Sequence, residues 1–383
     1  MAIGNRQSEI RNHFPTGPWA GAVLFLVILT ALATACSRRS YVPQAYLAFV
    51  ASAGSNSLAV VDLASFRTVA SIPVETGPEQ LALRPGKREV YVTAGSGRLS
   101  VVGFPELRVL RTLHVGRSVC DVRFAADGRQ AFVLDAADGQ IVFLDCDAWK
   151  VVTQVRAAAP LSSLVLAPDG KTLVASSSAA NRIFFVDVAS RKLLGSVEVG
   201  KQPGPMVFAA DSSRVYVADT GEEKITVADI TSRQVLSHIE LGMRPSALVL
   251  KPDGGELFVL SAAASTLAIV DASRDNVSQA ITTGRQPAAA VIRRDSTVLY
   301  IAGAGDGSLT TFDVGNRLVV AATHTGTEPR ALALTPDERF LVIADSATSS
   351  LAILRTDRSA LVTTIPVAAR PVDVVVPNWL WRQ

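Results

Sequence analysis

The sequence predicts an all-β protein, a β-propeller of eight four-stranded blades. Segments 245–286 and 329–370 share one order of apolar and turn residues, and similar segments open at intervals of 40 to 43 residues. A period of this length with four strand-like runs in each unit is typical of propeller blades. The segments open at Pro78, Ser118, Pro160, Pro203, Pro245, Pro287, Pro329 and Pro371.

Each unit predicts four strands, which we name a to d in chain order. Strand a alternates in polarity and ends in a turn such as Pro252-Asp253-Gly254, because Pro fixes φ and Gly accepts a positive φ. Strand b is a fuller apolar run, as at 257–259, and strand c ends in Asp, as at 267–271. Strand d is more weakly apolar. Short strands separated by turn residues in this way indicate an all-β chain.

The two ends of the repeat predict how the ring closes. The first unit starts at a strand b (46–50) and lacks strand a, whereas the last strand a (372–376) stands alone at the far end. Pairing these two strands completes a blade and removes an exposed sheet edge. We therefore expect eight blades, one of them built from both termini. Seven blades is the alternative, if a weak unit lies outside the ring.

These motifs resemble the YVTN family of bacterial and archaeal β-propellers. The nearest matches read EVYVT at 89–93 and RVYVA at 214–218, and the resemblance covers about residues 44–377. It implies the propeller fold and an exported or surface location. It implies no particular activity, because many members of the family have none assigned.

The first 35 residues predict an export signal. Arg6 and Arg11 precede an uncharged apolar run at 19–35, and small residues end that run, which is the order found in secretory signals. Residues 33–36, ATAC, resemble the bacterial lipobox, in which the cysteine is acylated and becomes the mature N-terminus. The resemblance implies that Cys36 carries lipid, and several acyl chains at ~0.8 kcal/mol per buried methylene give stable attachment.

The predicted organisation follows from these boundaries. We expect a lipoprotein signal peptide at 1–35, a lipidated tether at 36–44, the propeller at 45–377 and a tail at 378–383. The protein would then be exported and attached to a membrane by its lipid, at the outer membrane or another face of the cell envelope. A plain membrane anchor with an incidental cysteine is the alternative. The propeller itself is expected to be a monomer.

Composition and spacing exclude several kinds of site. The net charge of +3 is too balanced for a nucleic-acid-binding surface, so no nucleic acid is expected. No metal site is expected, because the histidines of the repeat lie in strand d of different blades. No catalytic motif is present, and the tryptophans do not recur by blade as in quinoproteins, so no cofactor is expected. Cys120 and Cys146 are expected to be free thiols, and Trp379 and Trp381 to pack against the closing blade.

Residues that recur in every blade are assigned to folding. Aspartates recur after strand c and in the a–b turn, where they can accept backbone hydrogen bonds. Basic residues remain in and next to the d–a loops, which share one side of a propeller with the b–c loops. They are candidates for a basic ring that binds an anion or an acidic partner, and the alternative is a solvated rim of mixed charge. They are Arg117, Lys201, Arg244, Arg285, Arg330 and Arg370.

Two functional hypotheses remain open. The favoured one is a non-enzymatic binding or scaffold protein that presents one side of the ring to a protein or a small anionic ligand. The alternative is an enzyme with a site at the channel mouth, a lactonase-like hydrolase or a subunit associated with an oxidoreductase. Non-recurring polar side chains converging on the axis would favour the enzyme. Asn56, Asn181 and Asp306 are scattered candidates for such a cluster.

Overall fold

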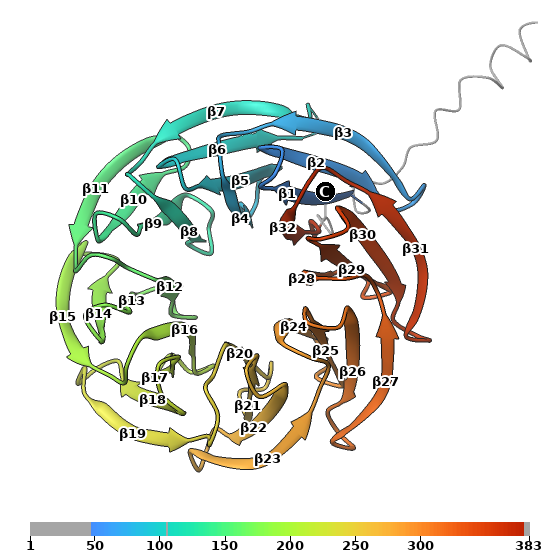
Figure 1. The fold of residues 1–383 in the computed structure, drawn as a ribbon. Coiled ribbons are helices and arrows are strands. Elements are labelled where there is room, and N and C mark those ends of the chain that lie inside the picture. The colour runs from blue at the N-terminus through green and yellow to red at the C-terminus, as the bar shows by residue number, and fades with distance from the viewer. Residues whose placement is uncertain (1–46, 105, 379–383) are drawn as a thin grey trace, which may run out of the picture. The chain divides into compact units, whose positions relative to one another are not determined.

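The computed structural model describes residues 47–104 and 106–378, which form eight four-stranded antiparallel sheets arranged around a ring (Figure 1). The predicted eight-bladed propeller is confirmed, and the seven-bladed alternative is wrong. The predicted signal peptide and tether with Cys36, and Trp379 and Trp381 of the tail, lie outside the described residues. The part of the chain that the structure describes contains no helix long and apolar enough to span a membrane.

Strands a and b of each blade lie nearest the ring axis (Figure 1). The innermost strands are β32 (Pro371–Val375), β4 (Pro78–Leu83), β8 (Val119–Phe124), β12 (Ser163–Leu166), β16 (Pro203–Phe208), β20 (Ala247–Leu250), β24 (Pro287–Ile292) and β28 (Pro329–Leu334). The second strands are β1 (Leu47–Ser52), β5 (Glu89–Ala94), β9 (Gln130–Asp135), β13 (Thr172–Ser177), β17 (Arg214–Asp219), β21 (Glu256–Ser261), β25 (Val298–Gly303) and β29 (Phe340–Asp345).

Strands c and d complete each blade toward the rim. The third strands are β2 (Ser57–Asp62), β6 (Arg98–Gly103), β10 (Gln140–Asp145), β14 (Arg182–Asp187), β18 (Lys224–Asp229), β22 (Thr266–Asp271), β26 (Ser308–Asp313) and β30 (Ser350–Arg355). The outermost strands are β3 (Arg67–Pro73), β7 (Arg108–His114), β11 (Lys150–Arg156), β15 (Lys192–Glu198), β19 (Val235–Glu240), β23 (Asn276–Thr282), β27 (Leu318–His324) and β31 (Ala360–Pro366).

The ring closes through one blade shared by both ends of the propeller. β32 pairs antiparallel with β1, with Phe49 opposite Val375 and Val50 opposite Val374. The sheet order β3-β2-β1-β32 therefore contains three N-terminal strands and one C-terminal strand. The predicted closure is confirmed, and it removes the edge that β1 would otherwise expose.

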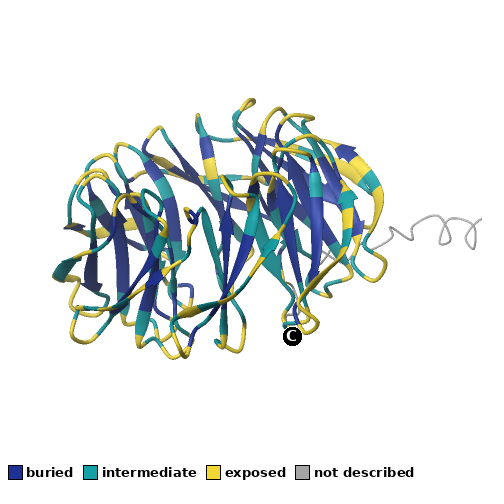
Figure 2. Cartoon of the chain, turned by 60° about the horizontal axis from the view of Figure 1, so that its bottom comes forward, coloured by how far each residue is buried: buried dark blue, intermediate teal, exposed yellow. Residues whose placement is uncertain are grey.

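The hydrophobic core lies between blades. Each interface between neighbouring blades holds its own cluster of buried aliphatic and aromatic side chains. Figure 2 shows the result: the strands are buried along their middles and the connecting loops are exposed. Strand b is buried on both faces, which explains why its sequence reads as a continuous apolar run.

The recurring aspartates serve the turns, as predicted. In every one of the twelve positions a carboxylate oxygen accepts a backbone N–H from the residue two or three positions further along. Asp271 is an example, because it accepts from Ser273 N at 2.9 Å and its pKa is lowered by its hydrogen bonds to the Ser273 side chain and backbone. These carboxylates stabilise local structure and are dispersed over the blades.

Candidate functional site

The six basic residues predicted to form a ring are all exposed, but they occupy three different positions relative to strand a. Arg117, Lys201 and Arg285 stand two residues before its first paired residue. Arg244 and Arg370 stand one residue before Pro245 and Pro371, the residues equivalent to Pro203 and Pro287 in the repeat, and Arg330 lies within β28. Five of the six therefore lie in d–a loops and Arg330 lies at the start of strand a, so the six do not share one position of the repeat.

Acidic neighbours compensate half of these charges. Arg117 pairs with Asp138 at 3.3 Å, Lys201 lies 3.8 Å from Glu222, and Arg330 pairs with Glu328. For the other three, no acidic side chain of the described residues lies within ion-pair distance. These are Arg244, Arg285 and Arg370.

The three scattered polar candidates hold the loops together. Asn56 Oδ1 accepts Gly77 N at 3.0 Å, and Asn181 Oδ1 accepts Gln202 N at 2.9 Å. Asp306 Oδ2 accepts Arg285 N at 2.9 Å. Each bond joins a b–c loop to the neighbouring d–a loop, so these residues have a structural explanation and do not converge on the axis.

A different residue breaks the repeat on the innermost strands. One position of strand a pairs with the third residue of strand b in every blade, and Arg123 fills it in β8, opposite Phe132. The equivalent residues in the other seven blades are small and aliphatic. They are Ala82, Val165, Val207, Val249, Val291, Ala333 and Val375. A single cation among seven aliphatic equivalents is not a residue that the repeated fold requires at this position, which makes it a candidate for function.

Arg123 is held in place by its own blade and the next one. Its Nε donates to Leu164 O at 2.9 Å, and a terminal nitrogen donates to Asp121 Oδ2 at 3.1 Å. The guanidinium side chain remains 40% exposed, whereas that of Asp121 is 11% exposed. The cation is therefore fixed in orientation while one face stays open to solvent.

Asp121 belongs to a chain of polar side chains that links three successive blade interfaces. The chain occupies the position two residues before Arg123 and before its equivalents in the two preceding blades. Asp373, Gln80 and Asp121 fill this position in three consecutive blades. In three other blades it is filled by alanine: Ala247, Ala289 and Ala331. Each of the three polar side chains accepts a backbone N–H from the next innermost strand. The donors and acceptors are Leu81 N to Asp373 Oδ2 (2.8 Å), Val122 N to Gln80 Oε1 (2.9 Å) and Leu164 N to Asp121 Oδ2 (3.2 Å).

Burial sets the electrostatics of this chain. Desolvation raises the pKa of Asp121, and the positive charge of Arg123 partly offsets that effect. The Asp373 residue retains some exposure, but its carboxyl group is closely surrounded by neighbouring blades, and this burial raises its pKa to about 6. The charges of Asp121 and Arg123 reach Asp373 as well. The cluster therefore holds two coupled carboxyl groups and one cation.

Next to Arg123 the innermost strands leave a cavity of about 560 Å³, which we call the axial cavity. Its walls come from β8, β12 and β16 and from the turn that follows β12. Phe124, Leu166, Met206 and Phe208 supply apolar surface. Arg123 is the only cation in the lining, and Asp169 of the turn is the only acid. An apolar cavity with a few fixed polar groups is the usual form of a small-molecule site.

Ionisation of the Asp373 carboxyl is expected to cost the protein stability between about pH 4 and pH 6. Its pKa is about 6 in the folded protein and 3.8 ordinarily, so the folded state keeps a proton that the unfolded chain releases. The resulting stabilisation is present at low pH and is lost as the pH rises through both values. We expect Asp373→Asn to flatten this decline by about 2 kcal/mol in urea unfolding measured across the same range.

The matched control for this experiment is Asp271→Asn. The pKa of Asp271 is lowered, so this residue stays ionised throughout the range and its replacement leaves the slope unchanged. Burial also raises the pKa of Asp219 to about 6. Asp219 therefore keeps part of the pH dependence of stability in both variants. An Asp373→Asn protein with the same pH dependence as the unmodified chain contradicts the assignment.

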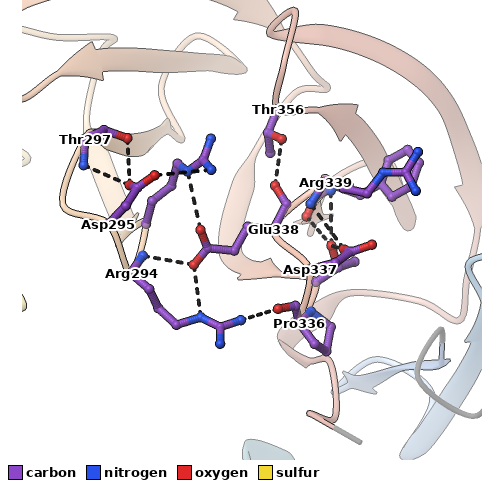
Figure 3. Close-up of polar contacts among 11 residues, drawn as sticks. Arg294, Asp295, Thr297, Pro336, Asp337, Glu338, Arg339 and Thr356 are labelled. Carbon is purple, nitrogen blue, oxygen red and sulfur yellow. Dashed lines mark hydrogen bonds and ion pairs between the residues drawn. The ribbon is translucent and has the colours of Figure 1, made fainter. Parts of the chain in front are cut away.

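A second polar cluster, shown in Figure 3, joins two blades. Glu338 accepts Arg294 N at 2.9 Å and Arg294 Nε at 3.1 Å, and Arg293 lies 3.4 Å from its other oxygen. Thr356 Oγ1 donates to the Glu338 carbonyl at 2.7 Å. The cavity here is only about 230 Å³, and two ion pairs of its lining, Arg293–Glu338 and Arg355–Asp357, occupy most of its charged groups. We interpret it as a link between β24–β27 and β28–β31.

The remaining candidates give no second chemical centre. His114, His238 and His324 lie on the outermost strands of different blades, as expected. Cys120 and Cys146 are free, also as expected. Within residues 47–104 and 106–378, no group of three potential metal ligands is close enough to hold an ion.

Arg123, Asp121, Gln80 and Asp373 were not predicted from the sequence. The recurring aspartates and loops do not reveal them, whereas a residue-by-residue alignment of strand a does. Such an alignment would have found an Arg where the other blades have Ala or Val, and an Asp where three have Ala. The signal was present in the sequence.

Comparisons with known proteins support the fold. The family model described as "Lactonase, 7-bladed beta-propeller" matches residues 254–374 only, while the chain has eight blades. No curated protein matches the sequence. The structure of dihydro-heme d1 dehydrogenase NirN in complex with DHE is similar with a TM-score of 0.78 and 16% identity, over 89% of this chain and 77% of that one.

Two further structures are similar at lower scores. Hydrazine synthase of Kuenenia stuttgartiensis has a TM-score of 0.55 and 18% identity, over 67% of this chain and 89% of that chain. A functionally unknown protein from Desulfotomaculum acetoxidans DSM 771 has a TM-score of 0.59 and 13% identity, over 78% and 99%. At these identities the likeness concerns the fold alone, and it places the chain among the β-propellers.

Proposed function

We propose that this protein binds a small amphipathic acid in the axial cavity and does not act as an enzyme. The observation that carries the proposal is Arg123, the one cation among seven aliphatic equivalents, standing at an apolar cavity of about 560 Å³. The cavity suits an apolar body, and the guanidinium suits a carboxylate, which it can bind through two parallel hydrogen bonds. Asp121 and Leu164 fix the guanidinium before a ligand arrives.

The location is part of the proposal. We infer that the chain is exported and attached through lipid on Cys36 to a membrane of the cell envelope, because residues 1–36 have the order of a lipoprotein signal. The propeller would then meet its ligand outside the cytoplasm. The exposed basic residues of the d–a side remain candidates for an acidic partner or a small anion.

Calorimetric titration with octanoate and octan-1-ol tests the ligand class, using the compact unit 44–383 so that no lipid or detergent competes. We expect octanoate to bind about tenfold more tightly than the alcohol, a difference of about 1.4 kcal/mol. The double variant Asp121→Asn/Arg123→Met should remove this preference without leaving a buried carboxylate unpaired.

Arg274→Met is the matched control, because Arg274 is exposed and pairs with Asp271 at the rim of the ring. It should bind both compounds like the unmodified protein. Equal affinity for octanoate and octan-1-ol in the unmodified protein would falsify the proposed ligand class.

A hydrolase of the lactonase kind is the second candidate. The family match at residues 254–374 favours it, together with Asp121, whose raised pKa is of the kind that general acids and bases have. Turnover of a lactone by the purified protein, lost in Asp121→Asn, would support this reading over the first. A role beside an oxidoreductase rests on the fold likeness to NirN alone.

A further inference from the structure

A further cavity, of about 480 Å³, lies among the d–a and b–c loops, on the side of the ring where these loops meet; we call it the loop cavity. Lys201 and Arg244 line it together with the amide side chains of Asn181 and Gln202 and the hydroxyl of Ser178. None of the residues that line it is acidic. The polar groups of this loop cavity therefore offer two positive charges and several neutral hydrogen-bond donors.

The loop that carries Lys201 and Gln202 is held rigidly. Gln202 has a φ of 53°, a left-handed conformation that its neighbours maintain. Its N–H donates to Asn181 Oδ1 at 2.9 Å, and its carbonyl accepts Thr220 Oγ1 at 2.7 Å. Gly221 N donates to Lys201 O at 3.0 Å. Because the backbone is fixed from both neighbouring loops, a ligand that binds these side chains does not have to order the loop first.

The two cations of the loop cavity are less compensated by acidic side chains than Arg117 on the same side. Arg244 has no acidic partner within ion-pair distance among the described residues. Lys201 lies 3.8 Å from one oxygen of Glu222, but Lys224 binds the other oxygen at 2.9 Å and lowers the pKa of Glu222. Arg117, by contrast, has Asp138 to itself at 3.3 Å.

We infer that the loop cavity binds a phosphate-type oxyanion. A guanidinium can bind two phosphate oxygens at once, an ammonium adds a compact charge, and the amides and hydroxyl can donate to the remaining oxygens. The oxyanion can be a free phosphate or the phosphate of a lipid headgroup, since both present the same oxygens. This site is separate from the axial cavity and narrows the predicted basic ring to two of its six members.

The test is ³¹P NMR titration of the full chain in a neutral detergent with inorganic phosphate. We expect saturable binding that weakens by at least about tenfold in Lys201→Gln/Arg244→Gln and that falls as chloride is added. Arg98→Gln is the matched control, because Arg98 is exposed and pairs with Glu75 at 3.5 Å. This control and Arg123→Gln, whose side chain lies at the axial cavity and not in the loop cavity, should bind phosphate like the unmodified chain.

The outcomes separate the inference from its alternatives. No saturable binding, or an equal loss in the Arg98→Gln control, overturns the site. A loss in Arg123→Gln instead would assign the phosphate to the axial cavity and would equally overturn it. If phosphate binds, competition by phosphatidic acid in phosphatidylcholine vesicles assigns the site to a lipid headgroup, and no competition assigns it to the free ion.

Discussion

Deleting residues 371–383 is expected to abolish the cooperative folding of the propeller. The deletion removes β32, so β1 loses its partner along Phe49 to Ser52 and presents an unpaired edge. It also removes Val374, which is 3% exposed, and the bond from Asp373 to Leu81 of the next blade. Truncating a single buried aliphatic side chain costs about 2–5 kcal/mol, so the loss of a whole strand should exceed the stability of an ordinary domain.

Urea unfolding followed by circular dichroism and by size-exclusion chromatography measures this effect. Deleting only 378–383 keeps β32 and separates the strand from the tail. We expect a much smaller loss in that variant, and the predicted packing of Trp379 and Trp381 on the closing blade would appear as an intermediate value. A chain without 371–383 that unfolds at the same urea concentration as the intact chain would contradict closure by β32.

Arg84→Met is expected to destabilise the protein by about 3–5 kcal/mol, because Arg84 is a buried charge whose partners would be left without it. Arg84 is 4% exposed and lies between the blades β4–β7 and β8–β11. It donates to Gly128 O at 2.7 Å, Glu89 Oε2 at 3.0 Å and Cys146 O at 3.1 Å, and it also pairs with Asp147. The substitution keeps most of the side-chain volume but leaves two carbonyls and the Glu89 carboxylate unpaired.

The matched control is Arg355→Met. Arg355 and its partner Asp357 are 44% and 52% exposed, and exposed pairs contribute about 0–1 kcal/mol. Equilibrium urea unfolding of the two variants should therefore differ by at least about 2 kcal/mol. Similar losses in both would mean that Arg84 contributes through packing rather than through its buried bonds.

The repeat made the fold predictable. Every blade contains the same four runs, and errors in one blade are corrected by the others; the lone strand at 372–376 even indicated the closure. The repeat also predicted that the basic residues lie in or next to the d–a loops, on one side of the ring. The repeat could not predict the surroundings of a single side chain. Arg117 is an example, because its acidic partner Asp138 stands in a different loop.

The candidate site was less predictable, for a physical reason. Arg123 is a single departure from the aliphatic residues at its position of the repeat. Its charge acts on Asp373, which is distant in sequence and close in space only because the ring closes. Arg84 was hidden in the same way, since its partner Asp147 is 63 residues further along. Residues that break a repeat become interpretable once the blades are aligned and placed side by side.

The most direct test of the account is a crystal structure of the protein with 8-bromooctanoate. The anomalous signal of bromine locates the apolar end of the ligand without reference to any expectation. We expect the bromine among Leu166, Met206 and Phe208, with the carboxylate on the guanidinium of Arg123. Bromine bound elsewhere on the propeller, or an empty axial cavity at saturating ligand, would contradict it.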